Sequence, residues 1–123
     1  MLKARDIMTK NAVSVKEDTP IYEAVKLLVK HNISGMPVVE DDMTLVGILF
    51  EKDLVILYYG NEEDERKTVG DFMTQPPIYF DENDSVSDVS DFLVKNIFGR
   101  VPITSGKKVV GIISIKNVLE SII

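Results

Sequence analysis

The tetrapeptide DIMT at residues 6–9 returns as DFMT at residues 71–74, a displacement of 65 positions (71 − 6). At the same displacement Pro37 matches Pro102, so the register is held well beyond the tetrapeptide. Self-similarity over such a distance is the sequence signature of a fold built from repeated units. The chain is therefore expected to contain two copies of one structural unit.

The register shifts by one residue within each copy. Gly47 matches Gly111 and Asp53 matches Asn117, both at a displacement of 64 (111 − 47). Surface turns tolerate the loss of a residue better than the elements they connect. The shift therefore predicts a shorter turn in the second copy.

Hydrophobic periodicity predicts the first elements of each copy. The run AVSV at 12–15 alternates as a short strand, and Thr19 and Pro20 then supply an N-cap and a first helical residue. Apolar residues between 21 and 29 recur at three- and four-residue spacing, which predicts a helix with one apolar face. This helix should end within KHNISG, residues 30–35.

The rest of the first copy predicts an antiparallel hairpin and a second helix. The β-rich runs at 36–40 and 45–50 flank the polar turn DDMT, and EKDLVILYY at 51–59 follows as a helix. The second copy repeats this β-α-β-β-α order with a strand at 77–80, a helix from Asp84, strands at 101–104 and 109–114, and a final helix at 115–123.

A polar segment separates the copies. All seven residues from Asn61 to Lys67 are polar or charged, which is typical of a linker. We therefore expect a first repeat at 1–60, a charged linker at 61–67 and a second repeat at 68–123. Each repeat is near the size at which an isolated core is marginal, so the two should pack on each other.

Composition argues against several classes of function. With 20 acidic and 14 basic residues the net charge is −6, which disfavours nucleic acid as a main partner. No cysteine is present and His31 is the single histidine, so no metal site is expected within one chain. Charged residues precede any apolar run at the N-terminus, which predicts neither a signal peptide nor a membrane span and favours the cytoplasm.

The motifs of both copies resemble a tandem pair of CBS domains, the module named after cystathionine beta-synthase. The resemblance covers nearly the whole chain and rests on DIMT and DFMT, on SGMPVVE and GRVPIT, and on VGILFEKD and VGIISIKN. It implies an α/β (α+β) fold in which two repeats, each with a three-stranded sheet, pack around a pseudo-twofold axis. It further implies two clefts that bind adenine nucleotides or related adenosyl compounds, association as homodimers, and a regulatory rather than catalytic role.

The second copy carries the family's ligand motif at Gly111, Ser114 and Asn117. If Ser114 caps the last helix, Asn117 lies on the same face of its first turn. Unpaired N–H groups at a helix start attract a phosphate, which the Ser114 hydroxyl could also contact. Asn117 replaces the family's aspartate and offers the ribose hydroxyls one carbonyl oxygen instead of a carboxylate.

Arg100 in GRVP resembles a basic residue that lies near the phosphates in relatives, and its forked donors suit that contact. Apolar walls for adenine are expected at the matching strand positions Ile78, Phe80, Val101, Pro102 and Ile113. The alternative is that Ser114 is only an N-cap and Arg100 only a solvated charge. Their combination inside the repeat favours the ligand site.

The first copy departs from the motif. Gly47 and Asp53 match, but Phe50 stands where the hydroxyl should be and Gly35 holds the place of Arg100. A phenyl ring donates nothing to a phosphate and would occupy the cleft. We therefore expect an apolar first cleft that binds a neutral adenosine-like group weakly, through Asp53, or binds nothing. Asp53 as a mere first-turn helix carboxylate is an equally open interpretation.

Together these features predict a regulatory module that binds AMP, ADP or ATP, or S-adenosylmethionine, chiefly in the second cleft. A homodimer is expected, regulating an effector protein such as an enzyme or a transporter. The sequence holds no Ser-His-Asp set, metal-ligand spacing or P-loop pattern, so no enzyme is expected. The alternative, favoured by Phe50 and Asn117, is a ligand-free scaffold for dimerisation or docking.

Overall fold

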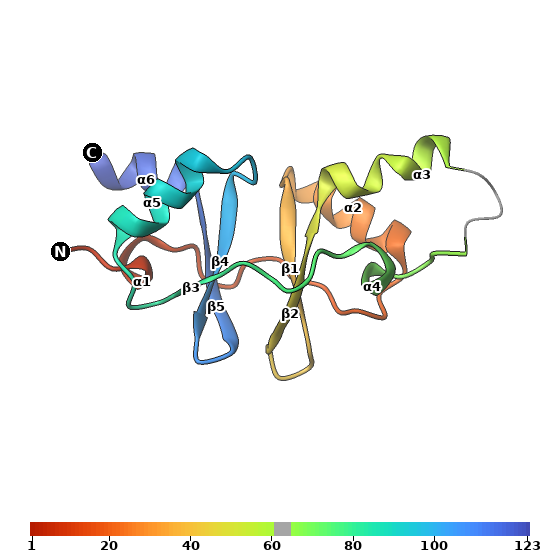
Figure 1. Cartoon of the computed structure of the whole chain (residues 1–123), viewed down its shortest axis with the longest axis horizontal. Helices are drawn as coiled ribbons and strands as arrows, with labels where there is room; N and C mark the ends of the chain where they lie inside the picture. The colour runs from red at the N-terminus through yellow and green to blue at the C-terminus, as the bar shows by residue number, and fades with distance from the viewer. Residues whose placement is uncertain (61–64) are drawn as a thin grey trace.

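Two halves lie side by side, with their strands toward the middle of the molecule and their longer helices outside (Figure 1). The computed structural model describes residues 1–60 and 65–123. Of the linker predicted at 61–67, residues 61–64 lie outside the described residues, and 65–67 form no regular element.

The elements follow the duplicated pattern of the sequence. The first half contains helix α2 (Ile21–His31), strands β1 (Gly35–Val39) and β2 (Leu45–Phe50), the 3-10 helix η1 (Glu51–Leu54) and helix α3 (Ile56–Tyr59). The second half contains strand β3 (Phe80–Asp81), helix α5 (Val86–Lys95), strands β4 (Arg100–Ser105) and β5 (Lys108–Ser114), and helix α6 (Ile115–Ile122). Two single-turn helices, α1 (Ala4–Ile7) and α4 (Val69–Phe72), were not predicted.

Both predicted hairpins are present. β1 pairs antiparallel with β2 and β4 with β5, while β3 lies parallel to β4. The turn at 106–107 is shorter than the turn at 40–44, as the register shift predicted.

The strand predicted at 12–15 is too long. Only Val15 pairs, through a parallel bridge to Val38. Its N–H donates to the Pro37 carbonyl, and its carbonyl accepts from the Val39 N–H. The first sheet is therefore two-stranded, with Val15 adding a bridge to β1 and Thr74 one to β2, whereas the second sheet has three strands.

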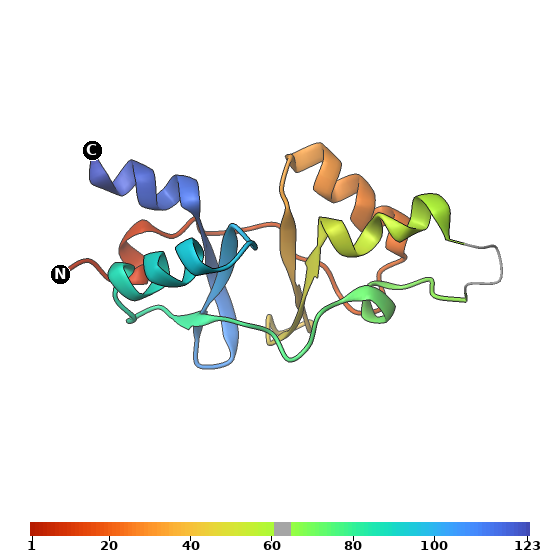
Figure 2. The same ribbon diagram turned by 45° about the horizontal axis from the view of Figure 1, so that its top comes forward.

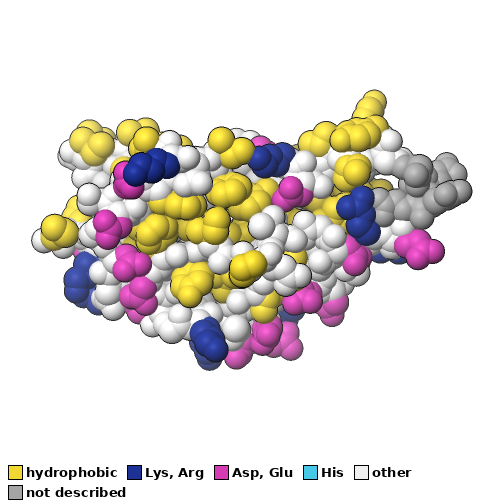
Figure 3. All heavy atoms as spheres, viewed as in Figure 1, with side chains coloured by type: hydrophobic (Ala, Val, Ile, Leu, Met, Phe, Trp, Pro, Cys, Tyr) yellow, Lys and Arg dark blue, Asp and Glu magenta, His cyan; other side chains and the backbone are white. Residues whose placement is uncertain are grey.

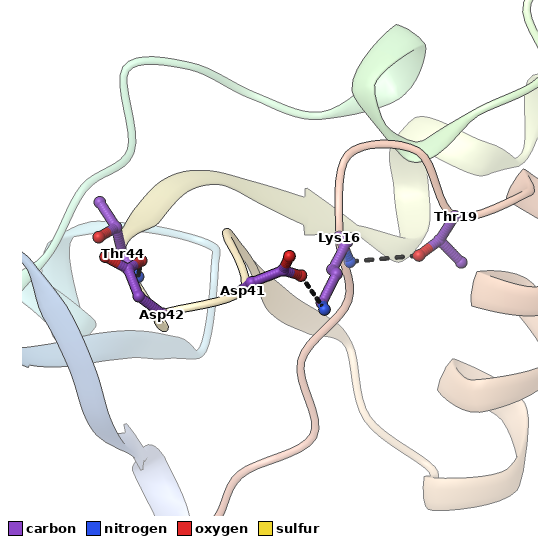
Figure 4. Close-up of polar contacts among 5 residues, drawn as sticks. All are labelled: Lys16, Thr19, Asp41, Asp42 and Thr44. Carbon is purple, nitrogen blue, oxygen red and sulfur yellow. Dashed lines mark hydrogen bonds and ion pairs between the residues drawn. The ribbon is translucent and has the colours of Figure 1, made fainter.

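The turn before α2 explains why this strand stops and why Thr19 is not the predicted cap. Helix α2 begins at Ile21 with Pro20 in the cap position. The Thr19 hydroxyl oxygen accepts from the Lys16 N–H at 3.2 Å and closes the turn (Figure 4). The Lys16 ammonium pairs with Asp41 in the β1–β2 turn, and this hydrogen bond and charge attraction raise the pKa of Lys16.

The helix predicted at 51–59 is broken, with Val55 between η1 and α3. Phe50 occupies the cap position of η1, and its side chain makes no cap hydrogen bond. The first N–H of η1, that of Glu51, donates instead to the Ser34 carbonyl at 2.8 Å. In the second half, α6 follows a serine and runs unbroken to Ile122.

The helix predicted from Asp84 begins two residues later, at Val86. Ser85 caps it, since its hydroxyl oxygen accepts from the Asp88 N–H at 3.0 Å. Within the described residues no helix is both long and apolar enough to cross a membrane.

The leading segment of the first repeat, from α1 to Thr9, packs against the second half. Ala4 of α1 is fully buried in the second core, beside Val89 of α5. Beyond α1, Thr9 and Ile112 of β5 exchange backbone hydrogen bonds of 2.8 and 3.0 Å in both directions.

The leading segment of the second repeat, from α4 to Thr74, packs in turn against the first half. Val69 and Phe72 of α4 belong to the first core, and Thr74 exchanges two backbone hydrogen bonds with Ile48 of β2. Figure 1 shows the outcome, with α1 (red) beside the second-half helices and α4 (green) beside the first-half elements. Each half is therefore completed by chain from the other repeat.

The middle of the molecule is formed by the strands. Val101 and Ile103 of β4 point into the second core. Because successive strand residues point to opposite faces, Arg100 and Pro102 lie on the face away from that core. β1 contacts β4 across the middle, and Figure 2 shows the two hairpins facing each other.

Candidate functional site

Ser114 ends β5 and caps α6, as predicted. Its hydroxyl oxygen accepts from the Asn117 N–H at 3.4 Å. Asn117 Oδ1 in turn accepts from the Ser114 N–H at 2.8 Å and from the Ser114 hydroxyl at 3.0 Å. This reciprocal arrangement is a capping box. The carbonyl oxygen expected to hold ribose is therefore already used within the protein.

The N–H groups at the start of α6 are also partly engaged, whereas the sequence predicted them to be unpaired. The Ile115 N–H donates to the Gly99 carbonyl at 3.1 Å, and the Asn117 N–H reaches Ser114. An anion at this helix start would have to share or displace these bonds.

Arg100 lies directly opposite Ser114 in the β4–β5 ladder. Its side chain is half-buried, and this burial lowers the pKa of the guanidinium, which stays charged at neutral pH. Its Nε–H is shielded from solvent and has no hydrogen-bond partner in the described part of the chain. A buried donor without a partner costs free energy, and a phosphate oxygen is an acceptor that matches a guanidinium well.

Thr9 is a site residue that the sequence analysis missed. Its hydroxyl oxygen accepts from Asn117 Nδ2 at 3.1 Å, so the first repeat contributes to the motif of the second. The repeated tetrapeptide was the available signal, because Thr9 and Thr74 are its equivalent last residues. Only the exchange of leading segments brings Thr9 to Asn117.

The first motif has the same exchange but a different centre. Asp53 accepts from the Thr74 hydroxyl at 3.4 Å, which mirrors the contact between Asn117 and Thr9. Phe50 is 5% exposed and stacks on Phe98 of the second half, with ring centroids 4.5 Å apart and planes 17° apart. An aromatic pair therefore occupies the position at which the second motif presents a hydroxyl.

Gly35 fits this packing. A Cβ at this position would lie 3.0 Å from the Leu49 carbonyl oxygen and 3.1 Å from the Phe50 ring. The residue that replaces Arg100 in the first repeat is thus small because the ring lies against its backbone.

The residues predicted as adenine walls differ in burial. Val101 and Ile113 are 1% and 0% exposed in the second core, so a ligand would reach them only through backbone atoms. Phe80 packs edge-to-face on Phe92 at 5.5 Å, and Ile78 is 37% exposed. Pro102 is buried on the face of β4 away from the second core. The structure thus brings together Arg100, Ser114 and Asn117, and places Asp53 at the other motif.

Large apolar side chains are exposed on the outer helices. Figure 3 shows them along the upper edge of the molecule, over α6 and α3. The exposed large apolar residues of α2, α3, α5 and α6 and of the turns beside them include Tyr22, Val29, Val55, Tyr58, Tyr59, Val94, Ile97, Ile115, Leu119 and Ile122. In the first half a groove of about 640 Å³ lies between α2 and the η1–α3 segment, lined by residues that include Val25, Leu54 and Tyr58. Apolar patches of this kind mark interaction surfaces in many proteins.

No cluster of three or more histidine, aspartate or glutamate side chains is placed to hold a metal ion in the ranges 1–60 and 65–123.

A model of the CBS domain matches the chain twice, at residues 4–60 and 69–123. Among curated relatives, the uncharacterized protein MJ1225 of Methanocaldococcus jannaschii is 33% identical over 110 residues, which cover 89% of this chain and 39% of the relative. The chain thus spans well under half of that relative's length.

Two solved structures match over almost the whole chain. CBSX2 of Arabidopsis thaliana in complex with AMP is 28% identical with a TM-score of 0.86, covering 99% of this chain and 96% of that one. The CBS domain pair of protein MJ0100, in complex with 5′-methylthioadenosine and S-adenosyl-L-methionine, is 28% identical with a TM-score of 0.83 and the same coverage.

Proposed function

The chain belongs to the CBS domain family, and on that basis we propose that it is a regulatory module that binds an adenine nucleotide at the second motif. The ligand is AMP, ADP or ATP, and S-adenosylmethionine is the related candidate. The module is not catalytic: it senses the ligand and changes the activity of a partner protein.

One observation carries this proposal. Arg100, charged and half-buried, lies across the ladder from Ser114 at the start of α6, with its Nε–H shielded and without a partner in the described ranges. Shielding the Nε–H donor without an acceptor is unfavourable, so its place beside a helix start favours a phosphate as the missing partner.

The relatives support the ligand class. CBSX2 was crystallised with AMP and the MJ0100 domain pair with two adenosyl compounds, and both match this chain over nearly its whole length. Of these ligands AMP suits this chain best, because it carries the phosphate that Arg100 would bind.

The exposed helix face supports association. We propose that a second copy covers it, so that the module is a homodimer, and that the regulated effector is a separate protein such as an enzyme or a transporter. A ligand can shift the equilibrium between two arrangements of such an assembly only if it binds one of them more tightly.

Calorimetric titration of the ligand-stripped protein with AMP, ATP and S-adenosylmethionine tests the proposal. We expect saturable binding near one site per chain. The Ser114→Ala/Asn117→Ala double variant should lose it, and Lys95→Ala, which changes only an exposed ion pair, should still bind one equivalent. Absence of heat with all three compounds, at two temperatures, would refute the nucleotide function, and full binding by the double variant would show that the motif was wrongly chosen.

The second candidate is a ligand-free scaffold for dimerisation or docking. The capping box favours it, because Ser114 and Asn117 already satisfy each other without a ligand. A folded dimer without any response to adenine compounds would support this function over nucleotide sensing.

A further inference from the structure

The segment from Phe98 to Arg100 is held at three points by three parts of the molecule. The Phe98 ring stacks on Phe50 at the end of β2. The Gly99 carbonyl accepts from the first N–H of α6, that of Ile115, at 3.1 Å. Arg100 then enters the β4–β5 ladder opposite Ser114. The segment therefore joins the first motif to the second.

Phe98 serves the contact between the halves and not the core of its own half. The aromatic pair of the second core is Phe80 with Phe92, and the partner of Phe98 comes from the first half. The Lys52 ammonium, also from the first half, lies 6.0 Å from the centroid of the Phe98 ring. The first half thus supplies both a ring and a cation to one side chain two residues before Arg100.

Gly99 has no side chain that could fix the direction of the segment by packing. Its φ is +73°, a conformation that glycine adopts without strain, and apart from the adjoining residues nothing lies within 4 Å of the place a Cβ would take. Side-chain packing therefore acts on Phe98 on one side of Gly99 and on Arg100 on the other. At the near end, Phe98 stacks on Phe50 and lies beside Lys52.

We propose that Phe98 is a positioning residue for Arg100, and that its stack on Phe50 makes the phosphate affinity of the second motif depend on the first half. This inference rests on the proposed nucleotide function for its effect on binding, but not for its structural part. Phe50, which replaces the motif hydroxyl in the first repeat, then contributes to the site of the second repeat without touching the ligand.

The structural part is tested without ligand, by ¹⁵N relaxation of the Arg100 Nε–H group. The sequence has three arginines, Arg5, Arg66 and Arg100, so Arg100→Lys assigns the signal. We expect greater mobility of this group in Phe98→Leu and in Phe50→Leu, and wild-type mobility in Phe98→Tyr, which keeps the ring. The matched control is Phe92→Leu, which removes a ring of the other aromatic pair and should leave Arg100 unchanged.

The binding part is tested by the ratio of AMP to adenosine affinity in the same variants. If Phe98 acts through Arg100, Phe98→Leu and Phe50→Leu should each weaken AMP binding about tenfold, in line with one charge-assisted hydrogen bond, and leave adenosine binding within about twofold. A general loss of structure would weaken AMP binding and adenosine binding alike, and Phe92→Leu provides the reference for such a loss.

The outcomes separate the two proposals. Wild-type mobility of Arg100 in both leucine variants would overturn the positioning role, whatever the protein binds. Raised mobility with an unchanged AMP-to-adenosine ratio would overturn the link to affinity. If the wild type binds neither compound, the proposed function fails, and the relaxation data alone decide whether Phe98 positions Arg100.

Discussion

The two repeats share one chain pattern but differ within the motif, and the difference at its hydroxyl position extends well beyond the cleft. Where the second repeat has Ser114, a capping box forms and α6 continues for eight residues. Where the first repeat has Phe50, η1 and α3 replace one helix and the ring stacks across to Phe98. The residue at this position is a helix cap in the second repeat and part of an aromatic contact in the first.

The two halves are alike in that each core includes residues from the leading segment of the other repeat. Neither core is therefore complete alone. Leu49 and Ile113 are equivalent residues, and both are 0% exposed. We expect Leu49→Ala and Ile113→Ala each to lower the free energy of unfolding by about 2–5 kcal/mol. Both should shift one common urea transition, followed by circular dichroism and by tyrosine fluorescence. Two separate transitions, only one of which moves with each variant, would mean that the halves unfold independently.

The charge difference between the clefts gives the next largest effect. Arg100→Ala should weaken AMP binding roughly 10- to 150-fold, the range for a hydrogen bond to a charged group, while adenosine binding changes little. Calorimetry measures both. Lys95→Ala is the matched control, since it removes one positive charge from an exposed pair with Asp91. An equal loss of AMP affinity in the two variants would make the effect one of net charge and not of the site.

The two motif glycines, Gly111 and Gly47, each lie against one of the exchanged leading segments, so alanine variants of both compare how tightly these segments pack. A Cβ at Gly111 would lie 2.6 Å from Met8 Sδ and 2.9 Å from the Thr9 carbonyl oxygen. A Cβ at Gly47 would lie 2.7 Å from Met73 Sδ and 3.1 Å from the carbonyl oxygen of the following residue. Each alanine variant should cost about 1–3 kcal/mol of stability by overpacking.

The loss should be larger at Gly111, where the backbone oxygen is nearer and cannot rotate away as a methionine side chain can. Urea unfolding gives both values. Adding Met8→Ala to Gly111→Ala should recover part of the loss, because it removes one of the two close contacts. Strictly additive losses would show that Met8 does not press on this position.

The smallest effect concerns acid stability. The Asp71 carboxylate accepts from the Lys67 N–H at 2.9 Å, and from the Thr68 N–H and hydroxyl at 3.0 and 3.1 Å. These bonds, that from Lys67 first, lower the pKa of Asp71 below its ordinary value of 3.8. Because the folded-state pKa is the lower one, the stabilisation is present above the unfolded-state pKa and is lost as the pH falls through the folded-state pKa.

Asp71→Asn should therefore flatten the fall in melting temperature on acidification below pH 5, measured by circular dichroism. The equivalent change in the other leading segment, Asp6→Asn, provides the comparison, since Asp6 accepts from the Lys3 N–H at 2.7 Å. A wild-type slope in Asp71→Asn would remove this carboxylate from the acid response.

The sequence by itself determined the duplication, both hairpins, the main helices and the motif positions. These follow from local rules: alternation along strands, apolar faces on helices, turn residues between them, and a capping residue before α6. The break at Val55 was mispredicted because the apolar pattern over 51–59 is helical throughout.

Only the tertiary structure decided that each motif is contacted by residues of the other repeat. Thr9 meets Asn117, Thr74 meets Asp53, and Phe98 meets Phe50, each across the boundary between repeats. Local periodicity carries no information about such partners, because the exchange is set by how the two incomplete cores cover each other. The same packing half-buries Arg100 opposite Ser114, which turned a basic residue in a motif into a charged group that needs an acceptor.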